Sequence, residues 1–565
     1  MLAGGAACRY TRDASRGDFA PAIGPQSAIQ SRRALPAARM AAPLSSAASV
    51  VRGVKVTTAL GDTTFSLRSF RYREAIGQPF EGVVDVVSAD DAVDLEAILG
   101  RPATVSVPLP AGGTRHFSGI CLEALQTGRL GDAFAYRLVI VPWLRLLEFA
   151  SDCRIFQQKT PKDILAEVFG ELGFTDHRLS GIVGDLPELE FCTQYDESHL
   201  NFVERLTQRF GIGYFTEHAD GSHTVAFTDS HSSHKPFPGY DRIRYAAGAA
   251  EAMGAEHVFF WQAGRRMATG KVILQDYDFT NPKSKLEATE SAGHRYPHGN
   301  LERYEYPGFY TKHSDGTALA RIRMDEQACR GRFFTGSARC YGLSAGFTFK
   351  LDGHPRGDQN AAYLTTAIDL VIEPADDAAA AGNAGRGADG AFACTCSFGA
   401  IPADVAYRPP RTARIPRIDG VQTAVVVGPE GQDPRVPYTD HYASVRVQFH
   451  WDRQGQDDEK SSCWLRHAQA FAGNGWGATF LPLVGCEVVV AFVGGDPDRP
   501  LVLGGVYNGE NKPPRDLAKY AARTVIQDPS GNFIVLDGQR EKESITILTS
   551  YKNNWWMIGN SENPG

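Results

Sequence analysis

Several features that would place the chain in other protein classes are missing from its sequence or scarce in it. No apolar run reaches the ~18 residues of a membrane-spanning helix, so we expect contact with a membrane only by mechanical means. The formal net charge of −7 does not indicate nucleic-acid binding, because such binding requires a clustered basic face. Ten cysteines in 565 residues are too sparse for a disulfide scaffold.

What is present is the composition of an ordinary globular protein, with 43% hydrophobic and 22% charged residues. The length corresponds to roughly three to four domains. Residues 1–50 are rich in Ala, Arg and Ser, show no periodicity and lack the apolar core of a signal peptide. We therefore predict that residues 1–50 are a disordered or non-native N-terminal extension, that Met40 is an alternative start, and that the chain has no signal peptide.

The most informative segment covers residues 421–511. It contains five or six short strand-like runs with turn residues between them and no helical period, which predicts a small closed barrel of the OB type. One run, residues 442–452, alternates as a half-buried strand does. Its apolar side chains fall on one face: Val445, Val447, Phe449 and Trp451. Its polar side chains fall on the other: Arg446, Gln448 and His450.

The upstream sequence predicts a first β-barrel-like domain followed by a helical insert. Residues 52–150 alternate like strands, with Gly and Asp at the breaks. Residues 151–222 change to the helical period, with Thr160 as the cap of one helix and Asp196 near the cap of another.

Strand patterns return over residues 223–372, with one helix near 316–330, and predict a second barrel-like domain. Residues 373–420 predict a linker that contains a flexible Ala/Gly-rich loop. The alternating strands of 512–565 have no helix to cover them, so we expect that three chains cover each other there. The predicted fold class is therefore mainly β with a minor α part.

Several long strings, in the correct order, make the chain similar to the VgrG family, the spike-tip proteins of type VI secretion systems. In the small barrel they are VVVGPEG, VQFHWDRQG, SSCWLRHAQ, GNGWG, LPLVGCEVVVAFVGGDPDRP and VYNG; upstream the string is YDESHLNFVERLTQRFGIGYF. The resemblance covers residues 52–511. It implies a phage-tail-like hub fused to the OB-fold base of a needle, and it implies that 512–565 form a linker and the start of a trimeric β-helix spike, which we interpret as truncated.

The resemblance also implies the function and the partners. We expect a homotrimeric puncturing device that carries effectors, with an Hcp-type tube ring, a PAAR-type tip protein, effectors or their adaptors, and baseplate components as partners. It would assemble in the cytoplasm and leave the cell through the secretion machine. Two alternatives stay open: the hub-needle protein of a contractile phage or prophage tail, and a specialised spike with its own hydrolase or toxin activity.

The residues that could be catalytic or bind a metal are better explained by structural roles in turns and packing. Ser344 stands in a G-x-S-x-G string, but a strand-like run follows where a nucleophile elbow needs a helix, so we expect a hairpin turn. The string Asp496-Pro497-Asp498-Arg499 is typical of a turn between strands. His450, Cys463 and His467 are predicted to be packed or solvated rather than to bind a metal.

The tryptophans and the close pair of cysteines also have structural explanations. Trp451, Trp464 and Trp476 are expected in core or trimer contacts rather than in a carbohydrate platform. Cys394 and Cys396 are expected to be reduced loop thiols. Trp555 and Trp556 point to opposite faces, so one needs cover from another chain. We expect Ile545, Ile547 and Trp555 inside a three-chain prism, and we predict no enzyme, no catalytic residue, no cofactor site and no metal site.

Overall fold

The computed structural model describes residues 50–248, 255–375 and 391–559. Residues 1–49 of the predicted extension, with Met40, and the predicted loop at 376–390 lie outside the described residues. Contacts divide the chain into Met1–Ser45 and Ser46–Gly565, and all elements below belong to the second unit. Among the described residues, no helix combines the length and the hydropathy needed to cross a membrane.

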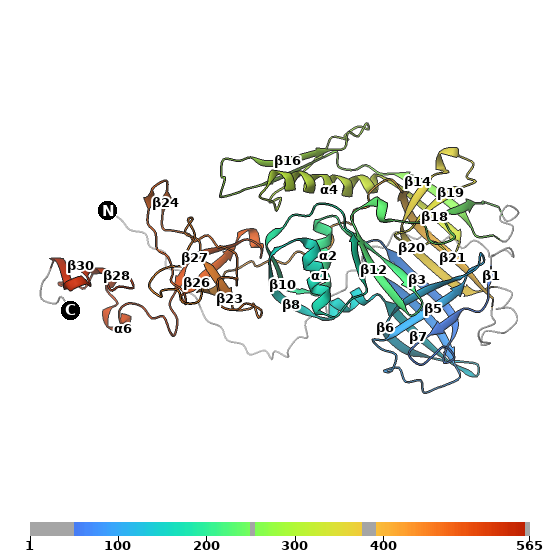
Figure 1. Ribbon diagram of the computed structural model, residues 1–565, viewed down its shortest axis with the longest axis horizontal. Helices are drawn as coiled ribbons and strands as arrows, with labels where there is room; N and C mark the ends of the chain where they lie inside the picture. The colour runs from blue at the N-terminus through green and yellow to red at the C-terminus, as the bar shows by residue number, and fades with distance from the viewer. Residues whose placement is uncertain (1–49, 249–254, 376–390, 560–565) are drawn as a thin grey trace, which may run out of the picture. The chain divides into compact units, whose positions relative to one another are not determined.

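The largest element is a sheet that contains thirteen of the described strands (Figure 1). The strands are β1 (Val50–Val51), β2 (Lys55–Thr57), β3 (Ser66–Ala75), β4 (Gln78–Ser88), β5 (Pro102–Pro108), β6 (Thr114–Leu130), β7 (Ala133–Val141), β13 (Arg242–Tyr245), β14 (His257–Arg265), β18 (Arg332–Arg339), β19 (Thr348–Asp352), β20 (Ala362–Pro374) and β21 (Phe392–Pro402). Their order is β1-β21-β18-β14-β13-β19-β20-β3-β4-β7-β6-β5-β2. Strand β20 pairs with β3, so the strands of the two predicted barrel-like domains share one sheet. Their inward side chains, among them Tyr72, Leu138 and Leu370, belong to one core.

Strand β21 corrects two predictions. It lies between β1 and β18 in the large sheet, so the linker predicted for 373–420 is wrong for residues 392–402. Cys394 and Cys396 are consequently not loop thiols: they are buried in this strand on the core side. The strand directly follows an Ala/Gly-rich stretch, and small residues, Cys394, Cys396 and Ala400, alternate with Phe392 and Phe398 on its buried face, so its apolar signal is weak.

The insert contains two helices that begin as their sequences predict. Thr160 caps α1 (Pro161–Glu171), since its side chain accepts the N–H of Asp163. The N-cap of α2 (His199–Arg209) is Ser198, and Asp196 lies two residues before it. Short strands accompany the helices: β8 (Ser151–Lys159) pairs with β10 (Leu189–Ser198), and β9 (His177–Gly181) joins β11 (Gly213–Ala219) and β12 (Ser222–Thr228).

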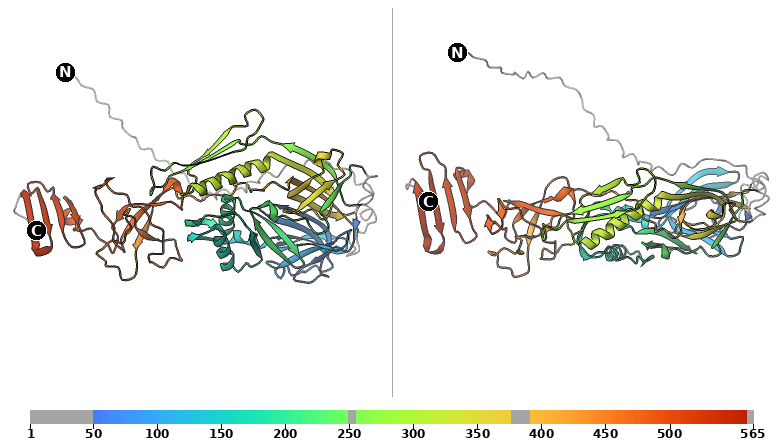
Figure 2. Two further views of the ribbon diagram at one scale, coloured as in Figure 1. Left: turned by 45° about the horizontal axis from the view of Figure 1, so that its top comes forward. Right: turned by 90° about the horizontal axis from the view of Figure 1, so that it is seen from above.

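A second α/β layer follows, in which α4 (His313–Gly331) packs along a small sheet (Figure 2). The sheet consists of β15 (Lys271–Asp276), β16 (Leu286–Ser291) and β17 (Glu302–Glu305). The side chains between helix and sheet include Leu274, Leu286 and Met324. The described residues also contain five 3-10 turns: η1 (Trp143–Phe149), η2 (His231–Ser233), η3 (Gly357–Gln359), η4 (Val493–Gly495) and η5 (Tyr551–Asn553).

The predicted small barrel is present around a four-stranded sheet of order β23-β22-β26-β27. Its strands are β22 (Gln422–Val427), β23 (Arg446–Phe449), β26 (Glu487–Phe492) and β27 (Pro500–Val506), and the hairpin β24 (Ala472–Gly473) and β25 (Trp476–Gly477) lies beside them in sequence. Val445, Val447 and Phe449 are buried in its core, as predicted. Gln448, on the face predicted to be polar, is buried as well, and a hydrogen bond from its amide to Asp452 O offsets the cost of burying it. The mainly β fold class and the OB-type barrel are thus confirmed.

Candidate assembly surface

The last described segment forms a four-stranded antiparallel sheet in the order β28-β29-β30-β31. The strands are β28 (Arg523–Gln527), β29 (Phe533–Asp537), β30 (Ser544–Thr549) and β31 (Asn554–Gly559), preceded by the short helix α6 (Leu517–Tyr520). Each strand alternates, so the sheet has two distinct sets of side chains. The pairing of the strands decides which residues share a face.

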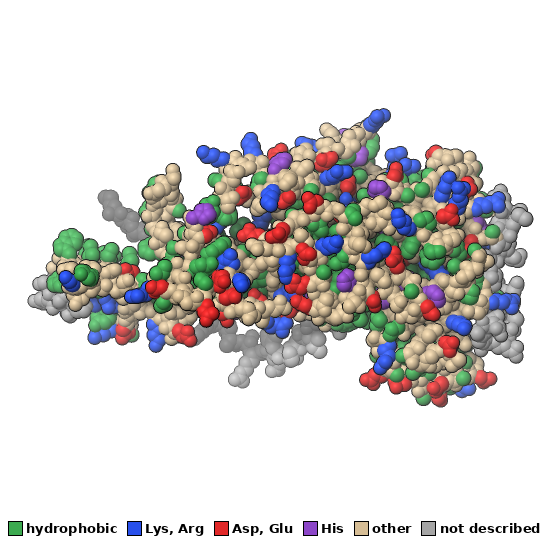
Figure 3. Space-filling model, in the orientation of Figure 1, with side chains coloured by type: hydrophobic (Ala, Val, Ile, Leu, Met, Phe, Trp, Pro, Cys, Tyr) green, Lys and Arg blue, Asp and Glu red, His purple; other side chains and the backbone are tan. Residues whose placement is uncertain are grey.

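One face carries large apolar side chains that no described part of the chain covers. Ile547 lies opposite both Ile534 and Trp556, and Ile545 lies opposite both Leu536 and Ile558. We call this set the open face: Ile526, Ile534, Leu536, Ile545, Ile547, Trp556 and Ile558, each 38–60% exposed. Figure 3 shows hydrophobic side chains gathered at this end of the chain.

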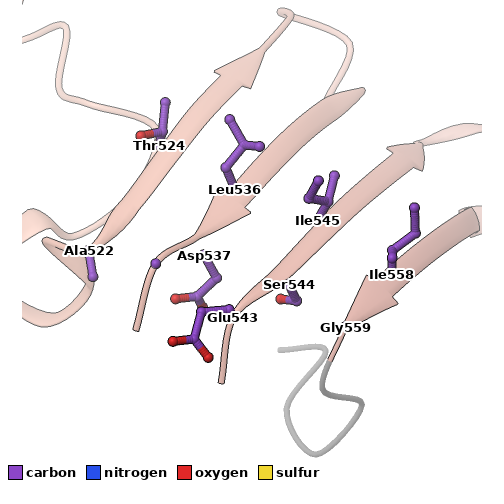
Figure 4. A pocket seen from close by; sticks show the side chains of 10 residues that line it. Ala522, Thr524, Leu536, Asp537, Glu543, Ser544, Ile545, Ile558 and Gly559 are labelled. Carbon is purple, nitrogen blue, oxygen red and sulfur yellow. The ribbon is translucent and has the colours of Figure 1, made fainter. Parts of the chain in front are cut away.

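One row of the open face lines a shallow hollow of about 440 Å³. Figure 4 shows Leu536, Ile545 and Ile558 in a row across three neighbouring strands, with Thr524 in line on the fourth. Asp537 and Glu543 lie at one end of the hollow. A contiguous apolar surface of this kind is typical of a site that another protein surface covers.

The opposite face is covered in part by the chain itself. Val535 is 7% exposed, and the Arg515 guanidinium carbon lies 5.0 Å from the centre of the Phe533 ring. Arg523 pairs with Asp537 at 2.7 Å and stacks on Tyr520 of α6. This face therefore has less apolar surface left to bury than the open face.

The register corrects one expectation. Trp555 lies opposite Leu548 on the partly covered face, so the prediction that Trp555 shares a face with Ile545 and Ile547 was wrong. Trp556 takes that place. Both indoles are largely exposed in the single chain, at 58% and 60%. The turn at Lys552 and Asn553, both with positive φ, sets this pairing, and its length was not readable from the strand pattern alone.

Ser344 lies in a turn, and strand β19 follows it at Thr348–Asp352 as predicted. The turn is not the hairpin that was expected, because β18 and β19 each pair with other strands. Its side chain is buried, and Oγ donates to Oε2 of Glu74 at 3.2 Å. The N–H of Ala345 donates to the same oxygen at 3.2 Å. Burial outweighs these bonds and raises the pKa of Glu74 to about 7. The hydroxyl of Ser344 thus links the turn to β3 and has no open approach.

The three residues considered for metal binding, His450, Cys463 and His467, each contact different neighbours. Nε2 of His450 lies 3.0 Å from Thr423 Oγ1, and Nδ1 of His467 lies 2.8 Å from the Gln469 amide. Cys463 packs against the barrel core, and burial raises the pKa of its thiol. Within the residues that the structure describes, no group of three or more His, Cys, Asp or Glu side chains could hold a metal ion.

Of the three barrel tryptophans, two pack against neighbours and one is exposed. Trp451 stacks on Phe449 at 4.9 Å and meets Tyr195 edge-on at 5.6 Å. Trp464 lies under the guanidinium of Arg446 at 4.7 Å. Trp476 is exposed in the β24–β25 hairpin and contacts Phe471. The three rings therefore do not share one stacking arrangement.

Two protein-family models match the chain. Residues 73–376 match the phage tail baseplate hub family (GPD). Residues 436–507 match the type VI secretion system/phage-baseplate injector OB domain. Fold and family models together define the class as a phage-tail-like hub joined to an injector OB domain.

Similar curated proteins narrow this class. The chain is 36% identical over 479 residues to the type VI secretion system spike protein VgrG1b of Pseudomonas aeruginosa, covering 85% of this chain and 63% of that protein. It is 35% identical over 483 residues to VgrG1a of the same organism, covering 85% of this chain and 73% of that protein. The chain belongs to the VgrG family of type VI secretion system spike proteins.

A third relative carries a different name. The actin cross-linking toxin VgrG1 of Vibrio cholerae is 29% identical over 504 residues, covering 86% of this chain and 45% of that protein. This chain thus spans 63% of VgrG1b and less than half of the toxin.

Solved structures share the fold. An E. coli component of the type VI secretion system has a TM-score of 0.55 at 19% identity, covering 80% of this chain and 100% of that chain. A chain of a Francisella PdpA–VgrG complex has a TM-score of 0.61 at 8% identity, covering 91% of this chain and 79% of that chain. At these identities the likeness shows the fold alone.

Proposed function

We propose that the chain is the structural spike-tip component of a type VI secretion system, a homotrimeric puncturing device that carries effectors into target cells. The observation that carries the proposal is the open face. Fully burying one large apolar side chain contributes roughly 1.5–3 kcal/mol, so seven such side chains strongly favour a covering surface. Copies of the same sheet around one axis would supply it, since each copy presents the same face.

The proposed partners follow from the family. We propose an Hcp-type tube ring, a PAAR-type tip protein, effectors or their adaptors, and baseplate components. A VgrG–PdpA complex among the structures of like fold supports the idea that a protein of this shape holds a further protein. The chain would assemble in the cytoplasm and then be delivered outward by the machine, without a catalytic role of its own.

Two other functions remain candidates. A contractile phage or prophage tail would use the same hub, which the match to the phage tail baseplate hub family supports. A spike with its own enzymatic activity is supported by the name of the Vibrio cholerae relative. An actin cross-linking assay and a wall-hydrolysis assay on the purified chain would separate the enzymatic candidate from the structural one.

The test of the proposal is the mass of the full chain in solution. Light scattering should report three chains per particle at micromolar concentration. The dye 1-anilinonaphthalene-8-sulfonate should bind little, because the open face is covered in the trimer. A stable monomer that binds the dye would overturn the proposal.

A further inference from the structure

The turn Asp496–Arg499 between β26 and β27 reaches from the OB domain to the hub. The guanidinium of Arg499 donates from Nη1 to Oδ1 of Asp276 at 3.1 Å and from Nη2 to Oδ2 at 2.6 Å. Asp276 ends β15, and its side chain is only 1% exposed. A two-point pair between a planar guanidinium and a carboxylate fixes orientation as well as distance.

The same turn holds a second hub element. The N–H of Thr193 in β10 donates to Oδ1 of Asp498 at 2.6 Å, and its hydroxyl donates to the carbonyl oxygen of Pro497 at 3.3 Å. Arg209, the last residue of α2, lies 3.7 Å from the Asp498 carboxylate. The turn is thus held by β15 through Arg499 and by β10 and α2 through Asp498.

The turn has its own internal bonds, so its shape does not depend on the hub. Arg499 N donates to Asp496 O at 3.0 Å, and Val493 N donates to Arg499 O at 2.9 Å. The N–H of Asp498 donates to Oδ1 of Asp496 at 3.0 Å. Pro497 has a fixed φ. The OB domain therefore presents Asp498 and Arg499 to the hub in a preformed arrangement.

The other contacts between the two domains include two single hydrogen bonds, apolar contacts and one exposed ion pair. The Gln422 amide donates to Tyr195 Oη and the Gln157 amide donates to Lys460 O, each at 2.6 Å. Phe191 of β10 is buried in the OB core, and Tyr195 meets Trp451 edge-on. Apolar contacts are largely non-directional and tolerate small rotations. Arg453 pairs with Asp152 at 2.8 Å, but its side chain is 75% exposed, and pairs of this kind contribute little.

We propose that the turn Asp496–Arg499 is a latch that sets the orientation of the OB domain on the hub, with Asp276 as the carboxylate that receives it. Opening the latch frees the OB domain to rotate on its other contacts with the hub while both domains keep their folds. Asp276 also accepts the N–H groups of Phe309 and Tyr310, so the hub loop retains a bond when Arg499 is removed. The latch rests on contacts within one chain and does not depend on the number of chains or on secretion.

The test is hydrogen–deuterium exchange of the full chain, read by mass spectrometry. The Thr193 amide is a direct reporter because its acceptor is Asp498. In Arg499→Gln, exchange of peptides that contain Thr193 should accelerate about tenfold or more, because the free energy of local opening is lower without the pair. Peptides from β7 and β26 should exchange as in the parent.

Two further variants sharpen the result. Asp276→Asn keeps an acceptor for the Phe309 N–H but loses the two-point pair, and it should accelerate the same Thr193 peptides. Arg453→Gln removes the exposed pair at the same junction and should change nothing. Unchanged Thr193 exchange in either latch variant would overturn the proposal. Acceleration in β26 to the same degree would overturn it too, since the turn would then stabilise the OB barrel itself.

Discussion

Ile547 in β30 lies directly opposite Trp556 in β31, on the open face of the terminal sheet. Both side chains remain exposed in the single chain, at 40% and 60%. An Ile–Trp pair across two strands buries most of its apolar surface only when a third surface packs against it. This pair is therefore the most direct point at which to test whether other chains cover the sheet.

Replacing Ile547 with Asp should dissociate the assembly. A carboxylate from each chain would approach the common axis, where burial and like charge both disfavour ionisation. Light scattering should show a fall from three chains per particle to one, while the thermal transition of the hub stays unchanged. The control is Gln527→Asp, which adds the same charge at an exposed position on the other face. Equal masses for Ile547→Asp and the parent would contradict the prediction.

The two neighbouring tryptophans should differ in their effect on assembly. Trp556→Ser removes an indole from the open face and should raise the concentration needed for trimers by about tenfold or more, as buried aromatic anchors do in interfaces. Trp555→Ser acts on the partly covered face and should leave that concentration nearly unchanged. Dilution series followed by light scattering give both numbers. The reverse ranking would show that the other face is the one that assembles.

The substitution Ser344→Ala should lower the stability of the hub and leave any activity of the chain unchanged. The substitution removes one donor from the buried carboxyl of Glu74, and an unmade buried hydrogen bond costs about 1–3 kcal/mol. Thermal denaturation should show a lower midpoint for the hub transition. Ser284→Ala, at an exposed position, should not shift the midpoint. Loss of a measured hydrolase activity in Ser344→Ala, with folding intact, would favour the enzymatic alternative.

His223 should make the hub less stable in mild acid. Its Nε2 accepts the N–H of Trp143 at 2.9 Å, and burial lowers the pKa of the imidazole from 6.5 to about 4. The imidazole therefore binds a proton at a higher pH in the unfolded chain than in the folded one. The stabilisation of the folded chain is complete above pH 6.5 and is lost as the pH falls toward 4. The loss is on the order of 3 kcal/mol at most.

The variant His223→Gln isolates this effect, because Gln can accept the same N–H and does not titrate. The decline in the free energy of unfolding between pH 6.5 and 4, measured by denaturant titration, should be shallower in the variant. Glu74 acts in the opposite direction, since its raised pKa of about 7 means that its contribution is present below pH 4.5 and is lost as the pH rises through 7. A decline of equal slope in parent and variant would exclude His223 as a source of acid sensitivity.

Local signals in the sequence predicted the helices well. Thr160 before Pro161 marks the start of α1, and the structure places the cap there. Capping and amphipathic periods involve residues three or four positions apart, so they are set by short-range geometry and can be predicted without the fold. The strand that follows Ser344 was predicted for the same reason, because its alternation is local, whereas the expected hairpin pairing was wrong.

The pairing of strands was harder to predict from the sequence than the helices. The sequence did not predict strand β21 because it directly follows an Ala/Gly-rich stretch and several of its inward residues are small, and only its place between β1 and β18 shows that it is part of the core. Trp555 was placed on the wrong face because the alternation of one strand says nothing about its register with the next. A shift of one residue exchanges all side chains between the two faces.

By itself, the sequence determined the class of fold, the starts of the helices, the turns between strands and the apolar character of the terminal strands, because each depends on residues close together in the chain. Only the tertiary structure decided that Trp556 rather than Trp555 joins Ile547, and that Arg499 reaches Asp276. The physical reason is that Arg499 and Asp276 are 223 positions apart. Their contact exists only once the hub and the OB domain have folded and docked, and no local pattern in either segment specifies it.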